Sequence, residues 1–221
     1  MVTTRRNLRA EHDSKSVPLV LRAMRYLDRA VAIAVEFFAI GVVSGALVTI
    51  AIPVFREMAV ALIQFRMLEP VRAASAFGSL ALSLLIFLNH SVPVVLSFAY
   101  PALIAKLQWT PPLSTQRRRI LLTAFTILTS FLTGFFSIGT PLTVFWLIRG
   151  SSELMTLLSH AWLHGPIEIA VILLCVSESS RLAISDSNEQ VLLNLRADLK
   201  LMFASFLVLL GSAVLEALLG L

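Results

Sequence analysis

Charged residues are scarce in this sequence of 221 residues, and cysteine is almost absent. Asp, Glu, Lys and Arg make up 14% of the chain, whereas soluble domains usually contain about 25%. The only cysteine, Cys175, lies inside an apolar run and has no second cysteine with which to form an internal disulfide. Hydrophobic residues account for 57% of the chain. This composition excludes a soluble enzyme, a disordered chain and a disulfide-stabilised secreted module.

The hydrophobic residues are gathered in five blocks that contain almost no charge: 31–55, 76–105, 120–148, 154–176 and 201–221. Each block can supply the ~20 residues that cross a bilayer. The first block is too long for the h-region of a cleavable signal peptide, which has about 7–15 residues. We therefore predict an all-α, multi-pass cell-membrane protein with about five transmembrane helices in residues 30–221, preceded by a basic tail in residues 1–29.

The distribution of Lys and Arg predicts how the chain is oriented. Residues 1–29 and the connections after the second and fourth blocks contain 14 of the 18 Lys and Arg residues. Because an excess of Lys and Arg marks the cytoplasmic side, we expect Met1 to be cytoplasmic and Leu221 to be extracytoplasmic. The same rule accounts for the basic tail, and no folded basic module accompanies it, so we expect no nucleic-acid partner.

Two amphipathic segments flank the first block. Val17–Arg29 predicts either a basic helix that lies on the cytoplasmic leaflet or a simple extension of the first transmembrane helix. Phe55–Met67 has helical periodicity and predicts an interfacial helix that ends at Glu69–Pro70.

Small residues in the first span predict close helix packing. Gly41 and Gly45 are four residues apart, a spacing that lets two helix backbones approach each other. We expect this face to pack within the chain, and a homodimer is the alternative.

The second block contains a proline beside polar residues. Pro93 follows Asn89 and His90 and cannot donate a hydrogen bond to the carbonyl of Asn89, so we expect a kink or a break there.

The fourth block repeats this arrangement at His164, Gly165, Pro166 and Glu168. A helix that begins at Pro166 would have Gly165 as its cap and Glu168 in a favourable first turn. This predicts a broken span, with one kinked helix as the alternative.

These polar residues are the candidate functional site. His164 and Glu168 lie one helical turn apart, and ionisable residues inside an apolar segment are a functional-site hypothesis by default. Three uses are open: a polar lock between helices, which we favour, a proton relay or transport site, and a metal site. His160, His164 and Glu168 are only weak candidates for a metal site, which needs three or four ligands, and no metal or cofactor is expected.

We expect the two breaks, with Asn89 and His90 on one side and His164 and Glu168 on the other, to face each other inside the bundle, because such groups are costly in lipid. Other polar residues receive simpler interpretations. Glu216 is expected to reach the interface at the end of the last span, and the serines around Glu178 are expected to be solvated cap residues.

One stretch resembles a known family. Leu163–Ala170 is similar to the Pro-His-Gly-x-x-Glu-Leu-Pro-Ala signature of the stage II sporulation protein M family. The resemblance extends over about residues 30–220, with a Gly-rich first span, Phe87–His90 in the second span, and Gly134 and Gly139 in the third. Leu163 and Thr133 depart from the family pattern, which has proline and asparagine at these positions.

The resemblance implies a non-enzymatic membrane scaffold with five spans. The founding member of the family anchors a complex with two peptidoglycan-degrading proteins, so protein partners in a membrane or cell-envelope complex are expected here. Gly41, Gly45, Gly134 and Gly139 are expected to pack helices together. The alternative is a small homo-oligomeric transporter or ion-conducting protein that uses His164 and Glu168.

Overall fold

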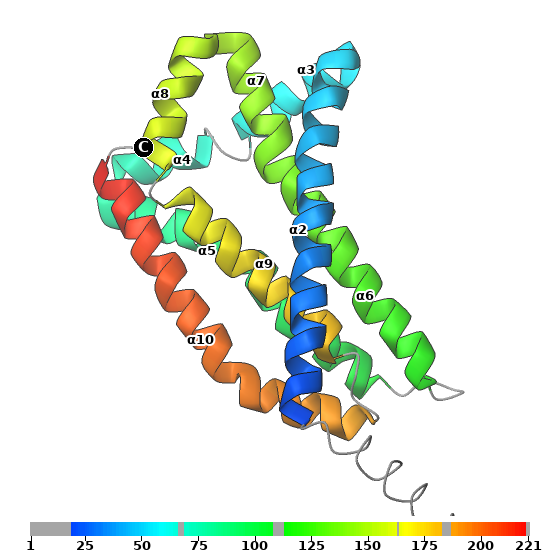
Figure 1. The fold of residues 1–221 in the computed structure, drawn as a ribbon. Helices are drawn as coiled ribbons and strands as arrows, with labels where there is room; N and C mark the ends of the chain where they lie inside the picture. Colours follow the sequence, from blue (N-terminus) through cyan, green and yellow to red (C-terminus); the bar gives the residue numbers. More distant parts are fainter. Residues whose placement is uncertain (1–18, 66–68, 108–112, 163, 183–186, 220–221) are drawn as a thin grey trace, which may run out of the picture.

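The fold is a bundle of long helices. The computed structural model describes residues 19–65, 69–107, 113–162, 164–182 and 187–219, and these residues form helices and short connections without any strand (Figure 1). The all-α prediction is confirmed.

Four stretches of helix are long and apolar enough to cross a membrane. They are α2 (Leu19–Ala51), α5 (Ser79–Lys106), α10 (Asn188–Leu219) and a rod made of α6 (Thr115–Leu132), η2 (Thr133–Gly139) and α7 (Thr140–Arg149). A bent pair, α8 (Ser151–Ala161) and α9 (Gly165–Leu182), makes a fifth span when its two helices are counted as one. The helices therefore have the lengths and composition of a polytopic membrane protein.

The first span begins well before the apolar block. Helix α2 runs without interruption from Leu19 to Ala51. Within the described residues, the segment before Arg29 is therefore an extension of the first span and not a separate helix. Residues 1–18 lie outside the part of the chain that the structure describes.

Two short helices connect α2 to α5. Helix α3 (Pro53–Ile63) follows the first span, as predicted, and α4 covers Glu69–Ala76. Glu69 and Pro70, which were expected to close the first of these helices, begin α4, and residues 66–68 between them and α3 lie outside the described part of the chain. Proline is well tolerated in the first turn of a helix, where backbone N–H groups have no intrahelical partner.

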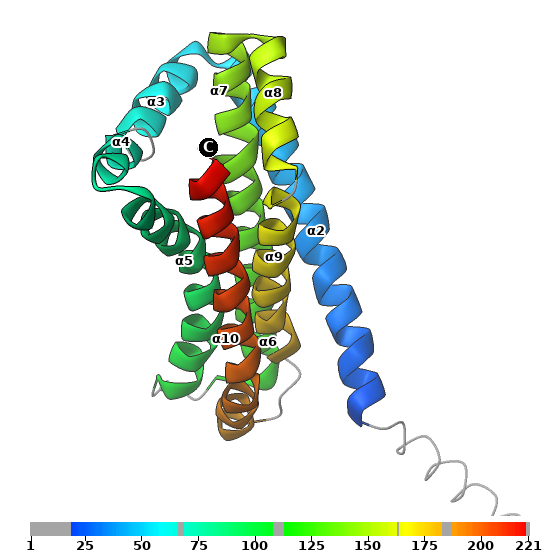
Figure 2. The same ribbon diagram turned by 90° about the vertical axis from the view of Figure 1, so that its left-hand side faces the viewer.

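Helix α5 continues through both of its prolines. Pro93 and Pro101 lie inside one helix, which changes direction partway along its length without breaking (Figure 2). The carbonyl of Ser97 loses its intrahelical donor because Pro101 has no N–H. The hydroxyl of Ser179 in α9 donates to this carbonyl at 2.9 Å. A neighbouring helix thus supplies the hydrogen bond that Pro101 cannot make. Of the two outcomes predicted for the second span, a kink or a break, the break was wrong.

The fourth block is broken, as predicted. Helices α8 and α9 differ in direction by 66°. Helix α9 begins at Gly165, so Gly165 is the first helical residue and not the cap, and Pro166 and Glu168 occupy the first turn. The backbone N–H of Glu168 donates to the carbonyl of His164 at 3.0 Å.

Helix α9 lies at the centre of the bundle. It packs against α2, α5, α6 and α10, and it contains more buried side chains than α6 of equal length (Figure 2). The hydrophobic core includes Val176 of α9 together with Val94, Leu122 and Leu209 of the surrounding helices. Because protein surrounds this helix, it can carry polar side chains that would be costly against lipid.

Four glycines bring α2 into backbone contact with the α6–η2 rod. A Cβ atom added at Gly41 would lie 2.2 Å from the carbonyl oxygen of Phe131, and one at Gly45 would lie 2.7 Å from that of Phe135. In the opposite direction, Gly134 and Gly139 face carbonyl oxygens of α2, with corresponding distances of 2.1 and 2.2 Å. The predicted packing role is therefore met within one chain.

The η2 segment explains how both glycines of the rod face α2. Five residues of an ordinary α-helix rotate a side chain about 140° away from its starting face. A π-helix joins residues five apart by hydrogen bonds, so Gly134 and Gly139 lie on one face. The π-helical turn thus places Gly134 and Gly139, which are five residues apart, opposite Gly41 and Gly45, which are four residues apart in α2.

One end of the molecule extends past the bundle. Helices α3 and α8 and the end of α7 lie beyond the level at which α10 ends (Figures 1 and 2). Among the described residues of α3, α4 and α8, only Ala59 is buried. Most of the surface of these helices is available for contact with other molecules.

Candidate functional site

The predicted contact between the second and fourth spans is present. His90 in α5 and Glu168 in α9 approach each other, with Nδ1 of His90 3.2 Å from Oε2 of Glu168. Glu168 is buried, and His90 is partly buried. The kink-forming segment of α5 and the first turn of α9 bring these two side chains together, as expected from the cost of facing them toward lipid.

The other predicted residues divide into two groups. His164 is buried beside the pair, and its Nδ1 has no hydrogen-bond partner among the described residues. Asn89 and Pro166 are exposed, and Gly165 is partly buried. His160 is exposed on α8, where its Nδ1 lies 2.7 Å from the carbonyl oxygen of Thr156 in its own helix. His160 therefore does not join His164 and Glu168.

The described His, Cys, Asp and Glu residues include no group of three that is placed to hold a metal ion. The stripe formed by His160, His164 and Glu168 on a continuous helix does not exist, because the chain breaks between α8 and α9.

Glu216 belongs to this cluster, and its expected position near the membrane interface stays a prediction. It lies in the last turns of α10, is only partly exposed, and interacts electrostatically with Glu168, His90 and His164. Its Oε2 is buried and has no hydrogen-bond partner among the described residues. The end of α10 lies about level with the start of α9 (Figure 1). We call His90, His164, Glu168 and Glu216 the outer cluster.

A signal for Glu216 was present in the sequence. Ser212 lies one helical turn before it in an otherwise apolar stretch, so the two polar side chains share one face of α10. The hydroxyl of Ser212 is buried and lies next to Glu168.

A cavity of about 280 Å³ opens beside His90 and Glu168. Its walls come from α3, α5, η2 and α9, and its polar lining is Asn89, His90, Thr133, Ser137 and Glu168. The volume is enough for several water molecules, each of which occupies roughly 30 Å³ in the liquid. Two members of the outer cluster, His90 and Glu168, thus border a space with a mixed polar and apolar lining, and one of its walls is the π-helical segment.

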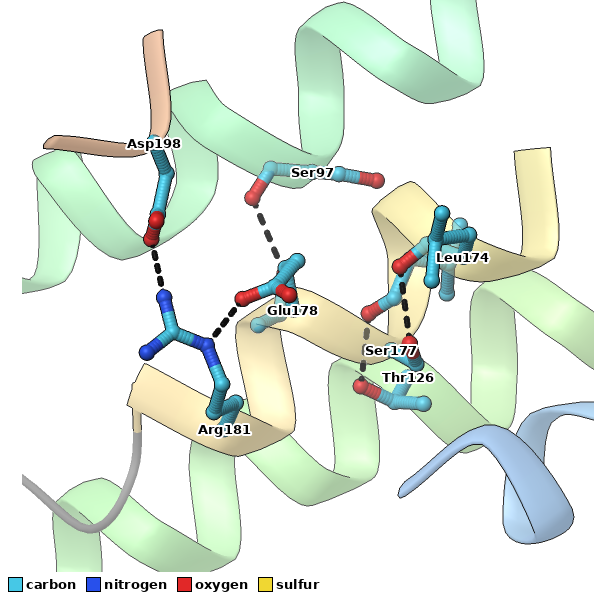
Figure 3. Close-up of polar contacts among 9 residues, drawn as sticks. Ser97, Thr126, Leu174, Ser177, Glu178, Arg181 and Asp198 are labelled. Atoms are coloured by element: carbon cyan, nitrogen blue, oxygen red, sulfur yellow. Dashed lines mark hydrogen bonds and ion pairs between the residues drawn. The ribbon is translucent and has the colours of Figure 1, made fainter. Parts of the chain in front are cut away.

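A second polar cluster lies nearer the other end of α9. Glu178 and Arg181 form an ion pair within α9, and Arg181 also pairs with Asp198 of α10 (Figure 3). Glu178 is buried, as are Ser177 and Ser179. The prediction that these residues are solvated caps was wrong. We call Glu178, Arg181 and Asp198 the inner cluster.

Hydroxyl groups beside the inner cluster tie α9 to two further helices. Ser179 donates to the carbonyl of Ser97 in α5, and Ser180 donates to Oγ1 of Thr126 in α6 at 2.8 Å. Thr126 in turn donates to the carbonyl of Val176 at 3.1 Å. Consecutive polar residues at the end of an apolar block are typical of a solvated end, but here they point outward from a central helix toward its neighbours.

The two clusters differ in what they can do. In the inner cluster, every side chain has an ionic partner from the same set, as expected for a structural connection between helices. In the outer cluster, Oε1 of Glu168, Nδ1 of His164 and Oε2 of Glu216 lack hydrogen-bond partners among the described residues. Buried polar groups are normally satisfied, so these atoms can bind water, a proton or a polar ligand.

Comparison with family models, with curated proteins and with solved structures gave no match to this chain.

Proposed function

We propose that this protein is a non-enzymatic membrane scaffold that holds a partner protein on its projecting helices. The observation that carries the proposal is the exposure of α3, α4 and α8, which together bury only Ala59 among their described residues. Large apolar side chains such as Val54, Met58 and Met155 are exposed on these helices. Apolar surface that the chain does not cover itself is a common mark of an interaction site.

The interior supports the same proposal. Backbone contacts at four glycines hold α2 against the rod, and the inner cluster holds α9 against α10. Such interlocked packing gives a fixed platform for the projecting helices. The excess of Lys and Arg at the opposite end favours an extracytoplasmic position for this platform. The resemblance to the stage II sporulation protein M family then points to a partner in the cell envelope.

Site-specific photocrosslinking in intact cells tests the scaffold function. A photoreactive amino acid at Met155, which is 65% exposed on α8, should form a protein adduct of defined mass. The matched control is Val43, which is 58% exposed on α2, where lipid is the expected neighbour. A protein adduct at Met155 but not at Val43 would support the proposal, whereas adducts at neither position would refute it.

A second function, conduction of protons or small cations, is favoured by one observation. The cavity is lined by the ionisable pair of His90 and Glu168, and intramembrane ionisable residues often mark ion pathways. Ion flux should then appear in liposomes that contain the purified protein and disappear in Glu168→Gln. Glu153→Gln is the control, because Glu153 lies on an exposed face of α8. Absence of flux in the wild-type protein would exclude this function.

A further inference from the structure

A groove of about 240 Å³ lies between α5 and α10, at the end of the bundle opposite the projecting helices. Its floor is made by Phe98 and Leu195, which are buried, and Leu199 forms an exposed wall. Apart from two cationic side chains, all of its lining residues are apolar: Phe98, Ala102, Leu192, Leu195 and Leu199.

The two cations are Lys106, the last residue of α5, and Arg196 of α10. Both residues are exposed, and neither forms an ion pair with a described residue. Arg181 of α9, by contrast, pairs with two carboxylates, one of which, Asp198, lies two residues after Arg196 in α10. The charges of Lys106 and Arg196 are therefore available to a molecule that enters the groove.

The geometry points to a binding site for one anionic phospholipid. An acyl chain would lie on the apolar floor, and the phosphate would lie between Lys106 and Arg196. Phe98 is eight residues before Lys106, so the floor extends about 12 Å from the cation toward the middle of the membrane. An apolar base beneath a cationic rim matches the two parts of a phospholipid.

The position of the groove favours a lipid over a soluble phosphate compound. Lys106 and Arg196 lie in the two connections whose Lys and Arg content predicts the cytoplasmic side, where the leaflet carries anionic lipids. Basic pockets between transmembrane helices on this side commonly bind anionic headgroups. The apolar floor would remain uncovered if only a soluble anion bound at the rim.

Native mass spectrometry of the full chain in detergent tests this site. The protein is titrated with phosphatidylglycerol or with phosphatidylcholine of the same acyl chains. We expect one tightly retained phosphatidylglycerol, with an affinity about tenfold higher than that of phosphatidylcholine. Lys106→Gln with Arg196→Gln should remove this preference.

The control is the pair Arg117→Gln and Lys200→Gln, two exposed basic residues near the same end that do not line the groove. It should retain the preference, and Leu199→Gln should weaken binding of both lipids. Equal affinity for the two lipids in the wild-type protein would overturn the proposal, as would an equal loss in the control pair. Displacement of the lipid by millimolar inorganic phosphate would show instead that the rim is a site for soluble anions.

Discussion

Gly134→Ala should separate α2 from the helical rod and destabilise the whole bundle. The added Cβ would lie 2.1 Å from the carbonyl oxygen of Phe38, and 3.0 Å from the backbone nitrogen of Val42. Ordinary van der Waals contact of a Cβ atom begins at 3.4 Å, so the two backbones must move apart by about 1.3 Å. No side-chain rotation can relieve the clash, because the obstructing atoms belong to the backbone.

The cost follows from the rigidity of the contact. Overpacking a well-packed interior usually costs about 1–3 kcal/mol, and this contact belongs at the upper end of that range, because separation also disrupts the packing at Gly41 and Gly139. For a chain of this size, about 3 kcal/mol corresponds to a decrease in Tm of roughly 6–12 °C.

The assay can use the single cysteine. Cys175 is fully buried in the folded protein, so a thiol-reactive fluorescent dye in detergent reports unfolding directly. Gly211→Ala in α10 is the matched control, because no atom of the described chain outside its own helix backbone lies within 4 Å of an added Cβ there. Alanine favours the helix by up to ~1 kcal/mol over glycine, so the control should keep or raise its Tm.

The difference in Tm between Gly134→Ala and Gly211→Ala tests whether the backbone contact exists. A Gly134→Ala protein whose Tm lies within 2 °C of that of Gly211→Ala would refute the proposed backbone contact. A change in oligomeric state without a change in Tm would show that the glycine face joins two chains instead.

Three further predictions concern charge and topology. Arg181→Gln should lower the free energy of unfolding by about 3 kcal/mol in detergent titrations, because it leaves two neighbouring carboxylates without a cation, and an unchanged value would contradict the structural role of the inner cluster. A double-mutant cycle of His90→Ala and Glu168→Ala should give a coupling energy of about 1 kcal/mol in unfolding measurements, and strict additivity would mean that the two side chains do not interact. Cysteines introduced at Glu57 and Arg117 should show opposite accessibility to a membrane-impermeant thiol reagent added to intact cells, and equal labelling would refute the five-span topology.

Much of the fold could be predicted because apolar blocks and prolines act locally. A block of about twenty apolar residues predicts a spanning helix wherever it occurs. A proline that follows a glycine, as at Pro166, favours the start of a new helix over continuation of the old one. The contact between His90 and Glu168 could also be predicted, since burial against protein is the cheapest position for both side chains.

The central position of α9 could not be predicted in the same way, and most of the errors follow from that. Serines around Glu178 at the end of an apolar block have the composition of a membrane interface. Whether lipid, water or other helices surround these serines depends on how five helices assemble. A local sequence pattern does not predict this assembly. The interaction of Glu216 with His90 and Glu168 was missed for the same reason, because these side chains come from α5 and α9 and not from α10.

The two clusters on α9 give its ends different freedom. Glu168 and Glu178 are ten residues apart, or about 15 Å along the helix axis. Just after Glu178, at the C-terminal end of α9, Ser179, Ser180 and Arg181 connect the helix to α5, α6 and α10. Three neighbouring helices therefore fix this end.

At the other end, α9 begins at a sharp break, beside a cavity, and with polar atoms that have no partners in the described chain. We therefore expect a displacement of α8 to be absorbed at the start of α9, because three neighbouring helices hold its opposite end. If a partner protein binds α8, as proposed, we expect the contact between His90 and Glu168 to respond first, because it lies in the first turn of α9.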